Sequence, residues 1–366
     1  MTRVLHLIHT PRHSGAEVLV RNLCLNDVEK GDVCSIASFA PLQPDFAPEA
    51  ELLVKAGVKL NFPEDALSKL GRIIHYRKII LDFKPDVIIA HSVLPSLYGR
   101  LALASLVGKR RFLSVLHAAS NDDYGAPLFE RLERILRRYI DVVVAVSREG
   151  ALNYERRFGS EIPIVIIPNG IDFSRFGRSE KSAARDKLGI SQTAKVILQV
   201  GRIAPVKQQS FTIEALRAQL SEGSLHLFLA GIFEDGSYLE VLEKQIKMWK
   251  LEEQVSLLGG RSDIPDLLSA ADVYVMPSIA EAQPIAIIEA LAAKLPVVAS
   301  RIPALEVYDG WQGVDLVDIG DMSSFSIAVM RHLSEERLYD RDLSAFSIGQ
   351  TAEKYRGCYN AHGRQP

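Results

Sequence analysis

Short apolar runs alternate along the chain with longer segments in which apolar residues recur every three or four positions. Each run is rich in Val, Ile and Leu and is bounded by turn-forming or polar residues, which is typical of a parallel strand covered on both faces. The segments between the runs have the spacing of amphipathic helices. In the first half of the chain the expected strands are residues 3–9, 32–39, 86–92, 111–118, 141–147 and 163–168.

The same alternation restarts after residues 168–180, a Gly, Pro, Asn and Ser-rich passage that we interpret as a linker. The expected strands of the second half are residues 195–201, 225–231, 254–260, 271–278 and 295–300. This pattern predicts an α/β fold of two Rossmann-like, doubly wound parallel-sheet domains that face each other across a cleft. Ligands of such sheets bind beyond the carboxyl ends of the strands, so the residues that follow each strand are the functional candidates.

Composition agrees with an ordinary globular protein. The 366 residues are 48% hydrophobic and 24% charged, and no apolar run approaches the roughly 18 residues that cross a bilayer. The N-terminus is too short and polar for a signal peptide. The three cysteines have no metal-ligand spacing and suit a reducing compartment. We therefore expect a cytoplasmic protein without a metal site.

Charge is distributed unevenly between the halves. Residues 1–170 contain 22 Lys and Arg against 19 Asp and Glu, whereas the remainder contains 21 against 26. A predicted amphipathic helix at 129–141 has four arginines on its polar side: Arg131, Arg134, Arg137 and Arg138. Either this is a solvated helix face, or it is a patch for anionic lipid at the inner leaflet of a membrane or for a phosphate-bearing acceptor. We expect no nucleic-acid partner.

Two loops after strands have the residues of an anion site. Ser14-Gly15 follows the first strand and precedes a helix, where a glycine lets backbone amides approach an anion, although turn formation alone also explains it. Arg202 and Lys207 follow the first strand of the second half. Together these two cations suit a diphosphate, and the alternative is a solvated loop.

Two carboxylates flank the start of an apolar helix in the stretch EAQPIAIIE, residues 281–289. Glu281 lies in the loop after a strand, Pro284 suits the first turn of the helix, and Glu289 lies about one turn inside it. Glu289 falls between two apolar flanks, where a carboxylate is costly unless something hydrogen-bonds to it. A ligand with hydroxyl groups would supply the partner. The alternatives are a helix-start charge for Glu281 and a salt bridge for Glu289.

Several motifs together resemble the family 4 glycosyltransferases, which are retaining enzymes of the GT-B fold with two glutamates separated by seven residues. The resemblance covers essentially the whole chain. The matching stretches are HSGAE (13–17), SVLHAAS (114–120), VSREGALNYERRFG (146–159), IPNGID (167–172), GRIAPVKQ (201–208), residues 271–300, Glu306 and TAEKYRGCYN (351–360). The last of these resembles a C-terminal helix that crosses back to the first domain. The implied domains are 1–170, completed by about 345–366, and a donor domain at 171–344.

The resemblance implies a role for each candidate residue. A nucleotide-diphosphate sugar, with UDP favoured over GDP, would bind the second domain with its diphosphate held by Arg202 and Lys207, while Gly15 presents a helix N-terminus. Glu281 would bind hydroxyls of the donor sugar, and His117 would line the reaction centre. Taken alone, a histidine at a strand end is more often a structural hydrogen-bonding group. No metal or other cofactor is implied, because the two cations replace it.

The remaining implied contacts lie at the start of the apolar helix. Glu289 would hold the ribose hydroxyls, and backbone around Pro284, Ile285 and Ala286 would lie against the donor. Asp122-Asp123 superficially suggests a metal pair, but we interpret it as loop. The implied reaction is sugar transfer to a glycan or lipid-linked acceptor in bacterial-type surface polysaccharide or glycolipid synthesis.

The sequence departs from the family pattern at donor-contact positions. The usual glycine pair is Ser14-Gly15, a common Glu-Gly-Phe-Gly is Glu281-Ala282-Gln283-Pro284, and a glycine before Leu-Pro-Val-Val is Lys294. Donor sugar, nucleotide and acceptor are therefore left open. Two alternatives to the transferase are a nucleotide-sugar epimerase of the same fold and a non-catalytic partner subunit. A dinucleotide oxidoreductase is excluded because no Gly-x-Gly-x-x-Gly follows a strand.

Overall fold

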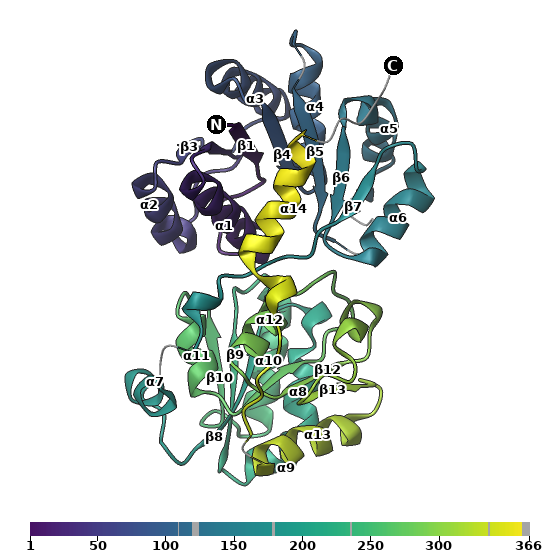
Figure 1. The fold of residues 1–366 in the computed structure, drawn as a ribbon. Helices are drawn as coiled ribbons and strands as arrows, with labels where there is room; N and C mark the ends of the chain where they lie inside the picture. The colour runs from purple at the N-terminus through teal and green to yellow at the C-terminus, as the bar shows by residue number, and fades with distance from the viewer. Residues whose placement is uncertain (109, 119–123, 178–179, 235, 336, 361–366) are drawn as a thin grey trace. The chain divides into compact units, whose positions relative to one another are not determined.

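The computed structural model describes residues 1–108, 110–118, 124–177, 180–234, 236–335 and 337–360, and Figure 1 shows its helices and strands. The chain forms two compact units. The first contains Met1–Ile171 and Ala345–Pro366, and the second contains Asp172–Ser344. Each unit is built around its own sheet.

The sheet of the first unit has seven parallel strands in the order β3-β2-β1-β4-β5-β6-β7. The strands are β1 (Arg3–Leu7), β2 (Val33–Ala37), β3 (Lys59–Asn61), β4 (Val87–His91), β5 (Arg111–Leu116), β6 (Val142–Ala145) and β7 (Ile164–Ile166). The chain begins in the middle of the sheet, builds outward to β3, and then returns to β4 on the other side of β1. The strand order therefore reverses between β1 and β4, which is where a doubly wound sheet opens a crevice.

The helices of the first unit are α1 (Gly15–Glu29), α2 (Ala47–Lys55), α3 (Lys69–Phe83), α4 (Val93–Ala104), α5 (Pro127–Leu136), α6 (Arg148–Phe158) and α14 (Ile348–Asn360). Two of them begin with a serine whose side chain satisfies an otherwise unpaired amide. Ser68 accepts a hydrogen bond from the Gly71 amide before α3, and Ser147 accepts one from Gly150 before α6, each at 3.2 Å.

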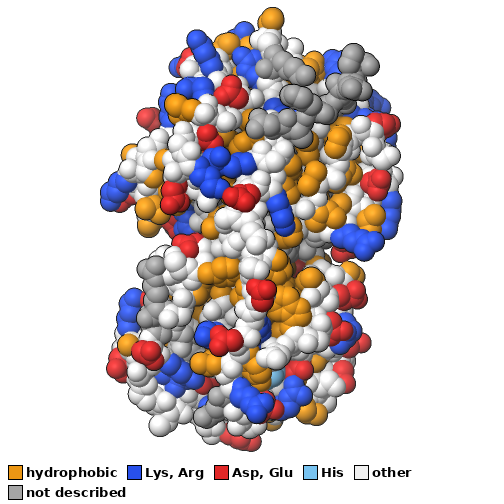
Figure 2. Space-filling view, in the orientation of Figure 1, with side chains coloured by type: hydrophobic (Ala, Val, Ile, Leu, Met, Phe, Trp, Pro, Cys, Tyr) orange, Lys and Arg blue, Asp and Glu red, His pale blue; other side chains and the backbone are white. Residues whose placement is uncertain are grey.

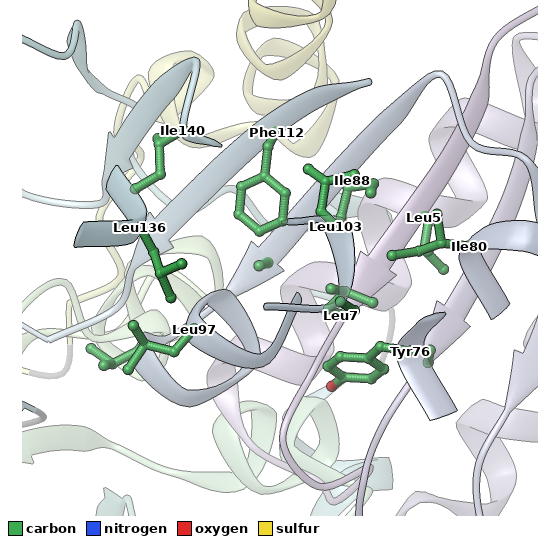
Figure 3. Close-up of a cluster of buried hydrophobic side chains, with 14 of the residues drawn as sticks. Leu5, Leu7, Tyr76, Ile80, Ile88, Leu97, Leu103, Phe112, Leu136 and Ile140 are labelled. Carbon is green, nitrogen blue, oxygen red and sulfur yellow. The ribbon is translucent and has the colours of Figure 1, made fainter. Parts of the chain in front are cut away.

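The main apolar core of the first unit lies on one face of its sheet (Figure 3). Leu7 of β1 and Phe112 of β5 contribute to it from the sheet, and Tyr76 of α3 and Leu97 of α4 cover them. Because successive side chains of a strand point to opposite faces, His6 of β1 points away from this core. A polar side chain thus enters the opposite side of the sheet.

The last helix is held to the first unit by polar contacts as well as packing. In Figure 1, α14 lies beside α1. Arg356 of α14 donates to Asp27 of α1 at 2.9 Å, and the Tyr359 hydroxyl donates to the same carboxylate at 2.9 Å. Where the chain leaves the first unit, a Cβ on Gly170 would lie 2.7 Å from the Ser347 carbonyl oxygen. Only glycine fits this close approach of two backbones.

The second unit repeats the same design with six parallel strands in the order β10-β9-β8-β11-β12-β13. The strands are β8 (Lys195–Val200), β9 (Leu225–Ala230), β10 (Val255–Gly259), β11 (Val273–Met276), β12 (Val297–Ser300) and β13 (Val314–Val317). The helices are α7 (Lys181–Leu188), α8 (Gln209–Ala215), α9 (Arg217–Ser221), α10 (Gly236–Met248), α11 (Ile264–Ala270), α12 (Ile285–Ala292) and α13 (Met322–Glu335). Here the order reverses between β8 and β11.

All eleven strands expected from the sequence form, and the predicted α/β class with two parallel sheets is confirmed. Two further strands, β3 and β13, were not predicted. Both are edge strands, and each includes partly exposed residues. Neither shows the apolar run of the predicted strands, because β3 is Lys-Leu-Asn and β13 is Val-Asp-Leu-Val.

None of the helices in the part of the chain that the structure describes is both long enough and apolar enough to cross a bilayer. Figure 2 shows basic and acidic side chains interspersed on the visible face. The predicted basic helix is also partly neutralised: Arg134 pairs with Glu130 at 3.1 Å, and Arg137 pairs with Glu161.

Candidate active site

The second unit places two loops side by side at the reversal of its strand order. One loop follows β8 and the other follows β11, and these strands are neighbours in the sheet. The Ile279 amide donates to the Val206 carbonyl across the loops at 3.0 Å. This contact brings residues more than 70 positions apart in sequence to one strand-end crevice, where ligands of this fold class bind.

An ion pair joins the two loops at this crevice. Lys207, at the end of the short 3-10 turn Pro205–Lys207, donates to the Glu281 carboxylate. Their side chains are only 15% and 8% exposed. The lysine is positioned from behind, because Gln199 of β8 donates to its carbonyl at 2.7 Å. Lys207 and Glu281, which the sequence suggested as separate candidates, thus form one largely buried ion pair.

The second predicted cation also has a carboxylate partner. Arg202 pairs with Glu234, in the loop after β9, and the two side chains are 43% and 36% exposed. The Arg202 carbonyl accepts a hydrogen bond from Gln209 at 2.9 Å. An exposed pair of this kind contributes about 0–1 kcal/mol, so an incoming anion displaces the carboxylate at little cost.

The backbone just before Arg202 lies so close to Gly231, at the end of β9, that no side chain fits at Gly231. A Cβ on Gly231, whose φ is +159°, would lie 1.9 Å from the Gly201 carbonyl oxygen. The Gly201 amide in turn donates to Ala230 at 2.9 Å. These glycines let the ends of β8 and β9 approach closely enough for Arg202 and Glu234 to meet.

Glu289 lies near the same crevice, on the fifth residue of α12. Pro284 precedes the helix, which begins at Ile285, one residue later than expected. The phenol of Tyr274 on β11 is influenced by both glutamates. Its pKa is raised well above the usual value by burial first, and then by the charges of Glu281 and Glu289. Both carboxylates therefore act on one buried hydroxyl, which donates to the Val200 carbonyl at 3.2 Å.

In the first unit, the loop before α1 is fixed by acidic side chains. Gly15 is the first, exposed residue of the helix, and Ser14 precedes it with its hydroxyl donating to Glu17. Burial raises the pKa of Glu17 despite that hydrogen bond. His13 contacts Glu49 of α2 at 3.1 Å. The loop is thus held from both sides while Gly15 remains open to solvent.

His117 follows β5 and ends a row of three histidines, which we call the histidine chain: His6, His91 and His117. Nδ1 of His6 lies 3.0 Å from Nε2 of His91, and Nδ1 of His91 lies 3.0 Å from Nε2 of His117. Successive rings stack with centroids 5.3 Å apart. They come from three adjacent strands, β1, β4 and β5, so the chain spans the reversal of the first sheet.

Burial keeps the histidine chain neutral. It lowers the pKa of His6 to about 3 and that of His117 to about 4, and it holds the pKa of His91 well below its usual range. The cause is desolvation, which penalises the imidazolium form. His6 and His91 are buried, whereas His117 is partly exposed. The strand ends of the first unit therefore offer an uncharged hydrogen-bonding group.

Both halves of the chain match glycosyltransferase family models. Residues 13–175 match the model described as Glycosyltransferase Family 4, and residues 180–341 match Glycosyl transferases group 1. The chain belongs to glycosyltransferase family 4. It is a transferase enzyme of the GT-B fold. The family and fold expected from the sequence are therefore confirmed. The matches also favour a transferase over the two alternatives, the epimerase and the non-catalytic partner subunit.

Relatives and solved structures agree with this family. The glycosyltransferase is 25% identical over 80% of its length to an Escherichia coli UDP-Gal:alpha-D-GlcNAc-diphosphoundecaprenol alpha-1,3-galactosyltransferase, of which 80% is covered. It is 22% identical over 74% of its length to the Bacillus anthracis N-acetyl-alpha-D-glucosaminyl L-malate synthase, with 71% of that protein covered. Anabaena Alr3699/HepE in complex with UDP and glucose superimposes with a TM-score of 0.77 at 22% identity, covering 97% and 94% of the two chains.

The candidate residues of the glycosyltransferase fall into two groups, one in each unit. Lys207 pairs with Glu281, the charges of Glu281 and Glu289 both raise the pKa of Tyr274, and Arg202 follows the neighbouring strand β8. Gly15 and His117 belong to the first unit. Asp122 and Asp123 lie outside the described residues. Within the described ranges, no three metal-ligating side chains cluster closely enough to hold an ion.

Sequence reasoning missed four residues of these clusters: Glu234, Tyr274, His6 and His91. The two histidines carried a signal, because His91 lies near the carboxyl end of the strand predicted at 86–92 and His6 interrupts the apolar residues of the strand predicted at 3–9. Tyr274 interrupts the aliphatic residues of its strand, which also marks it. Glu234 carried none, since an acidic residue in a loop is ordinary.

Proposed function

We propose that this protein is a retaining glycosyltransferase that moves a sugar from a nucleotide-diphosphate sugar to a glycan or lipid-linked acceptor. The observation that carries this proposal is the Lys207–Glu281 pair at the strand reversal of the second unit. A donor diphosphate is a stronger partner for the lysine than one carboxylate. When the diphosphate takes Lys207, Glu281 is released to accept hydrogen bonds from sugar hydroxyls. We include retention of configuration in the proposal because the sequence resembles the retaining glycosyltransferases of family 4.

Arg202 and Lys207 stabilise the negative charge that develops on the leaving diphosphate. Arg202 offers a planar fork of donors and Lys207 a point charge. Cations placed where charge develops in the transition state are the main source of catalysis in such transfers. We therefore propose that the reaction proceeds without a divalent metal, and we also assign Gly15 and the start of α1 to binding of the phosphates.

Glu289 and the start of α12 complete the proposed donor site. We assign the ribose hydroxyls to Glu289, and the backbone at Pro284, Ile285 and Ala286 to the sugar. The comparisons favour UDP as the nucleotide: one similar structure contains UDP and glucose, and the E. coli relative is named for UDP-Gal. His117 lines the reacting sugar in this proposal.

A lipid-linked acceptor is supported by the relative named for a diphosphoundecaprenol substrate, and by the surface of α5. Leu128, Arg131 and Ile135 of α5, with Arg138 of the 3-10 turn Arg137–Tyr139 that follows it, recur at spacings of three or four residues, and all four are exposed. An exposed stripe of apolar and basic side chains suits an anionic membrane surface. We propose that the enzyme works at the inner leaflet, in surface polysaccharide or glycolipid synthesis.

The test is a screen of labelled UDP- and GDP-sugars for binding and slow hydrolysis, each with and without excess EDTA. We expect a UDP-sugar to bind and to release its sugar at the same rate in EDTA. Loss of activity in EDTA that Mg²⁺ or Mn²⁺ restores would contradict the metal-free assignment. Conversion of the donor to its epimer without sugar release would favour the epimerase instead.

A further inference from the structure

The two hydrogen bonds of the histidine chain must run in the same direction. A neutral imidazole carries one N–H and one bare nitrogen, so His91 must donate one of its two hydrogen bonds and accept the other. The bonds join His6 Nδ1 to His91 Nε2 and His91 Nδ1 to His117 Nε2. Either every proton lies on Nδ1 and the bonds run toward His117, or every proton lies on Nε2 and they run toward His6.

The buried end of the chain distinguishes these two arrangements. His6 is fully buried, and its Nε2 has no hydrogen-bond partner within the described part of the protein. With protons on Nε2, this atom would be a buried N–H without an acceptor. With protons on Nδ1, it is a bare nitrogen. Orphaned buried N–H groups are rarer in folded proteins than under-satisfied acceptors, so the Nδ1 arrangement is favoured.

We propose that His6 and His91 are positioning residues that hold His117 in its Nδ1–H tautomer, so that His117 donates a hydrogen bond to an oxygen of the bound sugar. The contact with the sugar rests on the function proposed above, but the tautomer does not. Nδ1 of His117 is the end of the histidine chain that belongs to its partly exposed member. It is therefore the nitrogen that remains for a ligand.

The backbone at the middle of the chain supports this assignment. Ser92, directly after His91, has φ +73° and ψ 171°, a region that is essentially restricted to glycine. Its amide donates to the Val115 carbonyl of β5 at 2.9 Å, and its carbonyl accepts from Ser96 at 3.2 Å. Such a conformation costs about 1–3 kcal/mol and persists only where its surroundings hold it. The strained turn fixes the end of β4, and with it the ring of His91.

The direction of the chain also limits what His117 does. Its outer nitrogen already carries a proton, so it does not accept one as a general base. Loss of that proton would leave an imidazolate next to buried, uncharged rings, which desolvation opposes. Protonation is opposed as well, since burial lowers the pKa values of the chain. His117 is thus a neutral donor of fixed tautomer.

The tautomers are measured directly by ¹⁵N NMR of protein with labelled histidine, because protonated and bare ring nitrogens differ widely in ¹⁵N shift. Signals are assigned from single variants of His6, His91 and His117. We expect all three rings to have protonated Nδ1 and bare Nε2 at pH 7. A protonated Nε2 on His117 in the wild-type protein overturns the proposal, and this measurement requires no donor substrate.

His91→Phe keeps an aromatic ring in the stack but cuts the chain. We expect His117 to gain the Nε2–H form, and the rate of sugar transfer to fall about 5- to 10-fold, as for the loss of one neutral hydrogen bond. The control is His75→Phe, the same change on α3 outside the chain, which should alter neither readout. An unchanged His117 tautomer in His91→Phe contradicts the role of the chain. A shifted tautomer with undiminished transfer contradicts the contact with sugar while leaving the rest of the proposed function intact.

Discussion

The two domains have the same topology at their strand reversals but opposite chemistry there. In the second domain the reversal between β8 and β11 carries charge, with Lys207 paired to Glu281 and Arg202 to Glu234. In the first domain the reversal between β1 and β4 carries the histidine chain, which burial keeps neutral. The strand ends of the second domain thus carry ion pairs that a ligand can displace, and those of the first carry an uncharged hydrogen-bond donor.

This difference matches the two parts of the proposed donor substrate. A diphosphate is highly charged and requires cations whose counter-ions give way. A sugar is neutral, so its hydroxyl and ring oxygens are recognised by hydrogen bonds of fixed direction. An uncharged donor is sufficient for such bonds. The topology supplies the crevice in both domains, and a few side chains at the strand ends decide what each crevice binds.

The first domain does contain charge, but away from its strand ends. Arg100 of α4 and Glu133 of α5 form a fully buried ion pair, and the Tyr154 hydroxyl donates to Glu133 at 2.6 Å. Glu133→Ala leaves the guanidinium buried without its carboxylate, so we expect the first domain to lose about 3–5 kcal/mol of stability. Glu130→Ala, on the same helix but in exposed pairs with arginines, should cost less than about 1 kcal/mol.

Hydrogen exchange in residues 1–171 measures this loss. Trp249 and Trp311 lie in the second domain, and their fluorescence reports on that domain separately. Equal effects of the Glu130 and Glu133 variants would show that the buried pair is not a structural element of the first domain. The contrast between buried structural charge and displaceable strand-end charge would then fail.

The next largest effect is expected at the charged crevice. Lys207→Ala removes a cation that stabilises the leaving diphosphate, and should lower kcat/KM by about 30- to 1000-fold, or about 2–4 kcal/mol. This exceeds the loss expected for His91→Phe, as the comparison requires. Lys187→Ala, which removes an exposed lysine of the same domain paired with Asp266, is the matched control and should leave transfer unchanged. Wild-type turnover in Lys207→Ala would place the diphosphate elsewhere.

The two glutamates near Tyr274 sharpen the comparison within the second domain. Glu289→Gln should weaken binding of free UDP by about 1–3 kcal/mol, because the charge that holds the ribose hydroxyls is gone. Glu281→Gln should leave UDP binding unchanged or slightly tighter, since it frees Lys207, while sugar transfer falls. Calorimetry with UDP and turnover with donor separate the two. Equal losses of UDP affinity would return both residues to a structural role.

The smallest effect concerns a departure from the family pattern. Lys294 follows α12 with φ +64°, and the Lys294 and Leu295 amides donate to Leu291 at 3.0 Å and Ala290 at 3.1 Å. This is a Schellman motif with lysine where glycine is usual. Lys294→Gly should therefore raise the unfolding free energy of the second domain by up to about 1 kcal/mol. Lys78→Gly, inside α3, should lower that of the first by a similar amount. A loss of stability in Lys294→Gly would mean that its exposed pair with Asp340 outweighs the strain.

Much of the fold was encoded locally. Central parallel strands are buried on both faces, so apolar runs such as residues 87–90 and 295–299 can be recognised in the sequence. The candidate residues Lys207, Glu281 and His117 were expected after strands, and each of them follows a strand. Strands β3 and β13 escaped detection because β3 has only three residues and Asp315 interrupts the apolar residues of β13.

The tertiary structure alone decided which side chains meet. Lys207 and Glu281 are 74 positions apart, Arg202 and Glu234 are 32 apart, and His6 and His91 are 85 apart. Local pattern reports whether a residue is buried or exposed, but it does not report which distant strand lies beside it. That is set by the strand order, which results from packing the whole sheet between its helices. The sequence therefore located the crevices, and the order of the strands turned single polar residues into an ion pair in one domain and a histidine chain in the other.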